Sequence, residues 1–470
     1  MGEAKENHLL TRDTSKVSFI ERLMRHRAFQ FALQLPNFLV FILVILTGLF
    51  GVQSASANFS TVLTWVIWWA FIIFTFLFVG RLWCLMCPMG AVGEWVQRGS
   101  FWRRKKENRS LNLKWPRKLR NIWPATFFFL LVTLVDHNFG LVKSPLYTAY
   151  FLILMFTSSI VIGLIFEKRT FCRYLCPVGG LIGLYSMFAS TELRVKDKEV
   201  CKGHPGKDCV RGNENGYACP MFEFPQTLDR NNYCNYCAEC IKTCPQNNIA
   251  INIRPFSVDL FKTKRKYFDE AALALILTGL TAFQSIIMTT QWADWMSAIT
   301  TATHLSENIV FSSLFLLTAF SPLGAYLIIS KASIHLNGNT DSLRTVFVYY
   351  AYAFVPIGLA MHLAHNIFHV VAEGVNMIPI LSDPFGYGWN LFGTANLNLT
   401  PLLGIESIKI MQMLLVVLGY FAAAYVGYKI SLNVSDKKMA FRSYLPILLL
   451  IMAFTIVNLW ILDVPMLHRH

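Results

Sequence analysis

Four cysteines near the middle of the chain have the spacing of an iron–sulfur ligand run. The stretch CNYCAECIKTCP at 234–245 contains Cys234, Cys237, Cys240 and Cys244 as C-x2-C-x2-C-x3-C, followed by a proline. Thiolates hold iron in about tetrahedral geometry, and in bacterial ferredoxins this spacing directs three sulfurs to one cubane and the fourth to another. The run therefore predicts a [4Fe-4S] site, with a structural zinc site as the alternative.

Three more cysteines precede this run, namely Cys201, Cys209 and Cys219, the last followed by a proline. On the crossed pattern of two-cluster ferredoxins, Cys219 joins Cys234, Cys237 and Cys240 at one cluster, and Cys201, Cys209 and Cys244 hold a second. Two cubanes need eight ligands and the segment has seven cysteines. The second cluster is therefore expected as [3Fe-4S] or with His204 or Asp208 as a ligand. The alternative is one cubane on the 234–245 run beside three ordinary thiols.

Four other cysteines form a repeat. GRLWCLMCPMG at 80–90 and KRTFCRYLCPVGG at 168–180 each contain a basic residue, an aromatic residue, a cysteine, a Cys-Pro pair and a glycine two residues after the proline. Each motif follows an apolar stretch, so the four sulfurs of Cys84, Cys87, Cys172 and Cys176 are expected to converge. They would ligate a further cluster or metal, or act as a redox dithiol. The alternative is that Cys-Pro ends a helix and the thiols pack in the interior.

These motifs must be positioned by a membrane protein. Of the 470 residues, 54% are hydrophobic and only 15% are charged. Several apolar runs approach the roughly 20 residues that cross a bilayer. Nine spans are predicted at 31–51, 61–80, 121–136, 145–166, 268–290, 305–330, 345–372, 404–430 and 443–463.

The basic residues predict the orientation of these spans. The segment 81–120 carries eleven Lys and Arg, whereas 52–60, 291–304 and 373–403 carry none. Basic loops stay in the cytoplasm, which predicts an inner-membrane protein with its N-terminus inside and its C-terminus outside. The net charge of +15 mainly reports this bias, so nucleic acid is not an expected partner. All eleven cysteines then face a reducing compartment, which favours metal or redox roles over disulfides.

The expected fold is an all-α polytopic membrane protein with a small cytoplasmic ferredoxin-like α+β insertion. The expected domains are a cytoplasmic tail at 1–30, a four-helix membrane region with the Cys-Pro motifs at 31–190, the iron–sulfur domain at 191–266 and a five-helix membrane region at 267–470.

The ferredoxin run and the two Cys-Pro motifs resemble the membrane polyferredoxins of the NapH, NosR and CcoG type. The resemblance covers about residues 30–260. It implies electron transfer between a quinol pool or a cytoplasmic donor and a partner reductase or maturation system. The first motif, CLMCP, has two residues between its cysteines where the family pattern, like CRYLCP, has three.

A histidine stripe marks the second half of the chain. His362, His365 and His369 recur at helical spacing in FVPIGLAMHLAHNIFHVVAEG, and His304 begins the preceding span and could face them. Ionisable residues inside a membrane are costly and tend to line sites. The stripe predicts ligands of haem b or a quinone site, with a non-haem metal or a hydrogen-bonded polar seam as alternatives.

The sequence therefore predicts a membrane-bound electron-transfer protein. It would pass electrons between a quinone or haem site in the membrane and cytoplasmic [4Fe-4S] clusters, as the quinol dehydrogenase or quinone reductase subunit of a partner oxidoreductase. A soluble electron carrier is another expected partner for the basic inner face. The alternative is a maturation factor that uses its clusters to reduce a metal ion for another enzyme.

Overall fold

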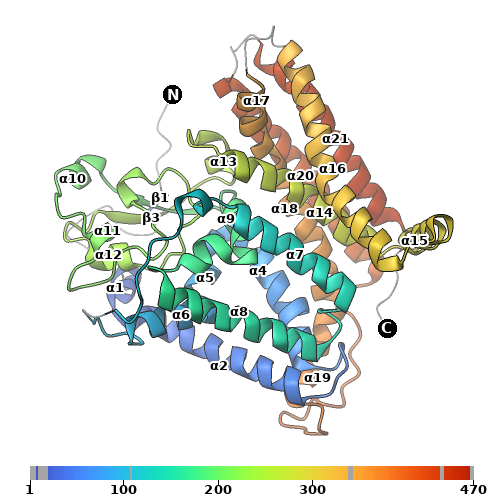
Figure 1. Ribbon diagram of the computed structural model, residues 1–470, viewed down its shortest axis with the longest axis horizontal. Helices are drawn as coiled ribbons and strands as arrows, with labels where there is room; N and C mark the ends of the chain where they lie inside the picture. The colour runs from blue at the N-terminus through green and yellow to red at the C-terminus, as the bar shows by residue number, and fades with distance from the viewer. Residues whose placement is uncertain (1–6, 9–18, 106–107, 337–341, 435–438, 466–470) are drawn as a thin grey trace. The chain divides into compact units, whose positions relative to one another are not determined.

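The computed structural model describes residues 7–8, 19–105, 108–336, 342–434 and 439–465 (Figure 1). Most of the predicted tail at 1–30 therefore lies outside the described residues. The chain forms two compact units. Unit 1 comprises Met1–Ser54, Thr75–Phe129 and Ser144–Asp259, and unit 2 comprises Ala55–Phe74, Leu130–Lys143 and Leu260–His470.

Seven helical segments in the described part of the chain are long and apolar enough to cross a membrane. They are Phe29–Phe50 (α2), Phe59–Arg98, Pro145–Ile165 (α8), Glu307–Leu336 (α16), Leu343–Ser382, Ile405–Val434 (α20) and Ala440–Asp463 (α21). All nine predicted spans fall on helices, but two of these helices are too short or too polar to be among the seven. Helix α7 (Trp123–Phe139) has only 17 residues, and α14 (Phe268–Ile286) begins with Asp269 and Glu270.

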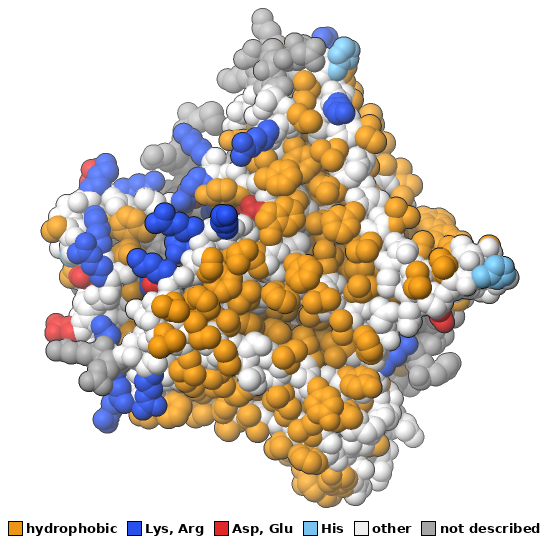
Figure 2. Space-filling model, in the orientation of Figure 1, with side chains coloured by type: hydrophobic (Ala, Val, Ile, Leu, Met, Phe, Trp, Pro, Cys, Tyr) orange, Lys and Arg blue, Asp and Glu red, His pale blue; other side chains and the backbone are white. Residues whose placement is uncertain are grey.

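The membrane helices of unit 1 pack through an aromatic core. Helix α2 and α8 lie against α6 (Pro88–Arg98), where Trp95 is buried against Phe31 and Phe38. Gln34 on α2 accepts a hydrogen bond from the indole of Trp95 and donates one to the carbonyl of Leu85. The outer faces of α2 and α8 are apolar, and Figure 2 shows hydrophobic side chains covering this area. This is the surface expected of helices solvated by lipid.

A small sheet with short helices follows the second Cys-Pro motif in unit 1. Strand β3 (Ile249–Ile253) lies between β1 (Asn7–His8) and β2 (Thr191–Val195), and both pairings are antiparallel. The short helices are α10 (Lys198–Lys202), α11 (Asp208–Arg211) and α12 (Glu239–Thr243). Apolar side chains of the strands and of α12, including Leu193, Ile241 and Ile251, form its core. The segment predicted to bind clusters is thus a folded α+β region.

Unit 2 is built around helices that are buried on several sides. Helix α14 packs against α16 and against α18 (Val355–Phe368), α18 packs against α20, and α20 packs against α21. Gly279 on α14 allows a close approach, because a Cβ there would lie 2.4 Å from the carbonyl oxygen of Thr318 on α16. Such small residues let membrane helices come together. Burial around nearly the whole of α14 explains why it can be shorter and less apolar than a lipid-facing span.

Two segments predicted as loops contain helices. Residues 291–304 are mostly α15 (Thr290–Thr303), whose first turn is capped by the side chain of Thr289. The segment 373–403 begins with the short helices η8 (Gly374–Asn376) and α19 (Met377–Ser382). Beyond α19 the chain is irregular, and the carboxylate of Asp383 accepts backbone hydrogen bonds from Tyr387 and Gly388.

Candidate iron–sulfur centres

Each Cys-Pro pair lies at a break between two helices. Cys87 has extended backbone angles between α5 (Trp83–Met86) and α6, and Cys176 has them between η4 (Phe171–Leu175) and α9 (Pro177–Tyr185). Proline disfavours a helical conformation in the residue before it and is well suited to the first position of a helix. The sulfur of Cys87 accepts hydrogen bonds from the N–H groups of Met89 and Gly90. Each Cys-Pro cysteine therefore lies at a helix N-terminus, where backbone N–H groups have no partner within the helix.

The structure brings the four Cys-Pro cysteines together. The thiol of Cys172 lies close enough to those of Cys176, Cys87 and Cys84 for their negative charges to repel one another when they ionise. A Cβ added at Gly90 of the first motif would lie 3.4 Å from the Cys172 sulfur of the second. Burial raises the pKa of Cys176 to about 12, and the neighbouring thiols of Cys87 and Cys84 add to this rise. The unligated Cys176 thiol is therefore protonated at neutral pH, and a metal must displace its proton.

Two buried arginines hold this group of thiols. Arg81 donates to the carbonyl oxygen of Cys172 at 2.9 Å, and Arg169 donates to that of Cys84 at 2.5 Å. Arg169 also forms a buried ion pair with Glu94, with 2.7 Å between nitrogen and oxygen. The Nε atoms of both arginines are buried without a hydrogen-bond partner. The positive charges of the two buried arginines would stabilise a bound group whose net charge, together with four thiolates, is negative.

Cys240 lies among the other cysteines of the ferredoxin region. Its thiol interacts electrostatically with those of Cys237, Cys234 and Cys219, which with Cys240 are the predicted first ferredoxin set, and also with that of Cys209. Burial raises the pKa of Cys234 to about 12. Backbone N–H groups face these sulfurs: that of Tyr236 donates to Cys234, that of Glu239 to Cys237, and those of Met221 and Glu223 to Cys219.

Positive φ angles shape this loop. Tyr236 and Ala238 have φ of 54° and 63°, an uncommon conformation for residues with a side chain. Alternation of left-handed and ordinary residues turns successive N–H groups to one side and makes an anion-binding concavity. The loop is therefore built to surround negative charge.

Cys244 belongs to a different group. Cys201, Cys209 and Cys244, the second ferredoxin set, line one pocket together with His204 and Asp208. The side-chain amide of Asn248 donates to the Cys201 sulfur at 3.2 Å. Its backbone N–H donates to the Cys244 sulfur at 3.3 Å. One residue thus fixes two of the three sulfurs.

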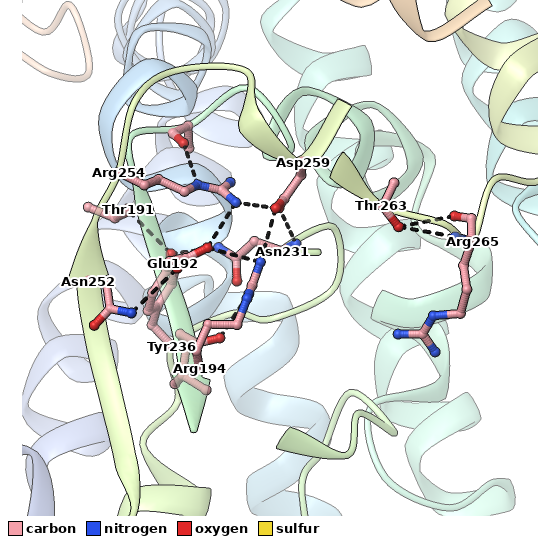
Figure 3. Close-up of polar contacts among 12 residues, drawn as sticks. Thr191, Glu192, Arg194, Asn231, Tyr236, Asn252, Arg254, Asp259, Thr263 and Arg265 are labelled. Atoms are coloured by element: carbon pink, nitrogen blue, oxygen red, sulfur yellow. Dashed lines mark hydrogen bonds and ion pairs between the residues drawn. The ribbon is translucent and has the colours of Figure 1, made fainter. Parts of the chain in front are cut away.

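A network of polar side chains braces the first set against the sheet (Figure 3). The Tyr236 hydroxyl lies 3.2 Å from that of Thr191 on β2 and accepts a hydrogen bond from the Asn231 side chain at 2.6 Å. The Asn231 N–H donates to Asp259 at 2.7 Å, and Asp259 also pairs with Arg254. These contacts fix the loop that carries Cys234 and Cys237 to Thr191 of β2 on one side and to the Asp259–Arg254 pair on the other.

The donor sets fit clusters better than single ions. Within the described residues, no three His, Cys, Asp or Glu side chains are arranged to hold one metal ion. Ligands of one zinc ion all lie about 2.3 Å from it, whereas each cysteine of a cubane binds a different iron and the sulfurs stand further apart. The buried thiols and the backbone N–H groups that face them suit the second arrangement.

The Cys-Pro site and the first ferredoxin set adjoin each other. Arg169 is electrostatically coupled to Cys172 and to Cys237, and its backbone N–H donates to the carbonyl of Pro220 at 3.2 Å. Nearby, the guanidinium of Arg173 stacks on the ring of Tyr233 at 3.0 Å from its centre. Arg169 therefore interacts with both the Cys-Pro site and the first ferredoxin set.

The predicted histidine stripe is found on α18 and the π-helix η7 (His369–Glu373) in unit 2. His362 is fully buried, and the rings of His365 and His369 lie 5.0 Å apart. His369 Nδ1 lies 3.0 Å from a carboxylate oxygen of Glu373. His304, in contrast, is exposed at the end of α15. A second π-helix, η1 (Val62–Trp68), contacts η7, and π-helices are frequent at functional sites.

Several of these residues were not predicted from the sequence. The roles of Glu94 and Asn248 have no motif that reveals them. The two arginines do have one, because Arg81 and Arg169 each stand three residues before the first cysteine of a Cys-Pro motif. The recurrence of a basic residue was noted, but its contact with the opposite motif depends on the fold.

Comparisons with known proteins agree with this geometry. Residues 61–110 and 148–196 match the model of a family described as a 4Fe-4S binding domain, and each matched segment contains one Cys-Pro pair. The predicted resemblance to membrane-linked 4Fe-4S ferredoxin-type proteins is confirmed, and the matches do not separate the NapH, NosR and CcoG types.

Two relatives extend the comparison. An uncharacterized protein of Methanocaldococcus jannaschii is 29% identical over 178 residues, which are 37% of this chain and 65% of the relative. The methylamine utilization ferredoxin-type protein MauN of Methylobacillus flagellatus is 26% identical over 138 residues, 28% of this chain and 47% of MauN. The chain thus spans less than two thirds of the length of either relative. No solved structure matches. Together the matches support an iron–sulfur electron-transfer role in a multi-pass membrane protein.

Proposed function

We propose that the protein carries electrons through three iron–sulfur centres arranged in series. The first is held by Cys84, Cys87, Cys172 and Cys176, the second by the first ferredoxin set and the third by the second ferredoxin set. The observation that carries this proposal is the position of Arg169, which bonds the Cys84 carbonyl and is coupled to both Cys172 and Cys237. The family match over both Cys-Pro segments supports a [4Fe-4S] cluster there.

The protein's own groups would prepare these sites. Bound clusters supply one-electron redox chemistry at potentials set by charge, burial and hydrogen bonds to sulfur. Arg81 and Arg169 offset the negative charge of four thiolates in a buried place. The N–H groups aimed at Cys87, Cys219, Cys234 and Cys237 stabilise the same charge. Because both devices favour added negative charge, they favour the reduced state.

In unit 2 we assign a quinone site to the histidine stripe. A haem with two histidine ligands needs them on opposite faces of its ring, and the buried histidines of the stripe lie on one helix. Oxidation of a quinol releases two electrons and two protons. The His369–Glu373 pair is a proton acceptor of the kind this requires. The electrons would pass singly to the clusters.

The topology and partners complete the proposal. The distribution of Lys and Arg supports an inner-membrane protein with the N-terminus and the clusters on the cytoplasmic side and the C-terminus outside. Helices α7 and α14 would raise the number of membrane helices from seven to nine. The partner would be an oxidoreductase or an acidic electron carrier, for which the protein serves as the quinol dehydrogenase subunit.

Proteoliposomes test this function. The anaerobically purified protein should contain roughly four irons per cubane. A quinol in the bilayer should bleach the cluster absorbance as dithionite does. In Cys172→Ser, dithionite should still bleach the ferredoxin sets, but bleaching by quinol should be lost. Equal quinol reduction in Cys172→Ser and the unaltered protein would exclude the series.

The maturation-factor alternative predicts a different result. Tight copper binding by the four Cys-Pro thiols, with no quinol response in the unaltered protein, would replace electron transfer by metal handling.

A further inference from the structure

The second ferredoxin set has three cysteines where a cubane has four ligands. Its pocket is lined by Cys201, Cys209 and Cys244, and the two other side chains there with metal-ligating ability are His204 and Asp208. Both are about one quarter exposed, so they stand at the mouth of the site rather than in the protein interior. One of them is placed to complete the set.

The spacing favours His204. Ferredoxin runs begin with C-x2-C, and here Cys201 is followed after two residues by His204. The chain turns between these two residues, and the His204 N–H donates to the Cys201 carbonyl at 3.4 Å. The histidine therefore occupies the position of the second cysteine in a run of the form Cys201-x2-His204-x4-Cys209.

The contacts of the side chains give Asp208 a different task. Its carboxylate lies 3.2 Å from Nε2 of His204, which leaves Nδ1 as the ring nitrogen for a metal. Carboxylates commonly orient metal-binding histidines in this way through the nitrogen that does not ligate. Gly206 makes room for the pair, because a Cβ there would lie 3.1 Å from the imidazole and 3.3 Å from the carboxylate.

We propose that His204 is the fourth ligand of the second ferredoxin set, binding iron through Nδ1, with Asp208 as its positioning residue. This rests on the proposed function, since it assumes that the set holds a cluster. Replacement of a thiolate by a neutral imidazole makes the cluster less negative and raises its reduction potential. The partly exposed second set would then be the centre from which electrons leave for a soluble carrier.

Pulsed electron paramagnetic resonance on the reduced, full-length protein tests the assignment. The protein is made once with ordinary histidine and once with ¹⁵N-labelled histidine. A nitrogen coupling that changes with the label should appear, and it should vanish in His204→Ala. His204→Cys should keep the cluster without the coupling and lower its reduction potential. Asp208→Asn should keep the coupling with a changed magnitude.

Two outcomes separate failure of this inference from failure of the proposed function. A cluster in the second set without a histidine nitrogen coupling, and with the same spectrum in His204→Ala, overturns the ligand assignment alone. If the Cys201→Ser variant keeps all of its iron, the second set holds no cluster. That result overturns the proposed series as well. His335→Ala, at the exposed end of α16, is the matched control and should leave spectrum and iron content unchanged.

Discussion

The guanidinium of Arg81 donates to the backbone carbonyl of Cys172, 91 residues further along the chain, at 2.9 Å. Arg169 makes the reciprocal contact with the carbonyl of Cys84. Each arginine lies three residues before the first cysteine of its own motif and binds the first cysteine of the other. The two Cys-Pro motifs therefore form one site with approximate twofold symmetry, in which neither half is complete alone.

Loss of Arg169 should destabilise the fold as well as the site. Arg169→Met leaves Glu94 buried with only Arg98 as an ion-pair partner. Removal of one member of a buried pair costs about 3–5 kcal/mol, and the measurement is thermal unfolding in detergent. The double variant Arg169→Met with Glu94→Gln should recover part of this loss. An equal loss in both variants would contradict the buried-pair explanation.

Gly179→Ala should disrupt the Cys-Pro site. The new Cβ would lie 2.9 Å from the carbonyl of Cys172, a backbone atom that Arg81 already holds. Overpacking of this kind costs about 1–3 kcal/mol, and the measurement is iron content together with thermal unfolding. Gly324→Ala is the control, because nothing lies within 4 Å of the added group and the residue is inside helix α16. That change should be neutral or slightly stabilising.

Glu373→Gln should slow electron entry from quinol without affecting the clusters. The change removes the charge that faces His369 at 3.0 Å and with it the proposed proton acceptor. The initial rate of cluster bleaching by quinol should fall at least tenfold, while bleaching by dithionite stays the same. His304→Ala, at an exposed position, should change neither rate. A quinol rate that Glu373→Gln leaves intact would remove the pair from the quinone site.

Tyr236→Phe should weaken the loop that carries Cys234 and Cys237. The buried hydroxyl accepts a hydrogen bond from the Asn231 side chain and lies 3.2 Å from the Thr191 hydroxyl. Its removal takes away the acceptor of the Asn231 amide, whereas Thr191 keeps its bond to the Phe78 carbonyl. The expected cost is about 1–3 kcal/mol, seen as a lower unfolding temperature and faster loss of iron to a chelator. Tyr349→Phe is the control, since its hydroxyl makes only a long exposed contact with the Lys264 carbonyl.

Much of the site follows from the sequence, because ligand spacing is a local property. The Cys172 thiol lies near the three other Cys-Pro thiols, as the repeat indicates. The crossed grouping of Cys219 with Cys234, Cys237 and Cys240 stays a prediction, since Cys240 lies near these three thiols and also near Cys209. The first motif, CLMCP, departs from the family pattern because it has one residue fewer between its cysteines than CRYLCP. The structure absorbs this difference, since Phe171–Leu175 forms a π-helix of 5 residues where Trp83–Met86 forms an α-helix of 4. A π-helix accommodates one inserted residue without moving what flanks it.

The membrane helices were predicted less completely. The hydropathy of a segment depends only on its own residues, whereas the burial of a helix depends on the helices packed around it. Hydropathy therefore does not predict which helices are buried within the protein. Helix α14 is surrounded by protein, so it tolerates Asp269 and Glu270 and falls below the span criterion. Residues 291–304 were predicted as the loop between two apolar spans, but most of them form helix α15, of which only Met296 is buried.

The proposed exchange of Cys219 and Cys244 between the two ferredoxin sets would have a consequence for biogenesis. With these ligands, neither set could be completed from one continuous stretch of chain, because the last cysteine of each comes from the other run. Assembly of a cluster on one set would fix the position of a chain segment that also carries ligands of the other set. Insertion should therefore be nearly all-or-none, and oxidative damage to one centre should release the iron of both.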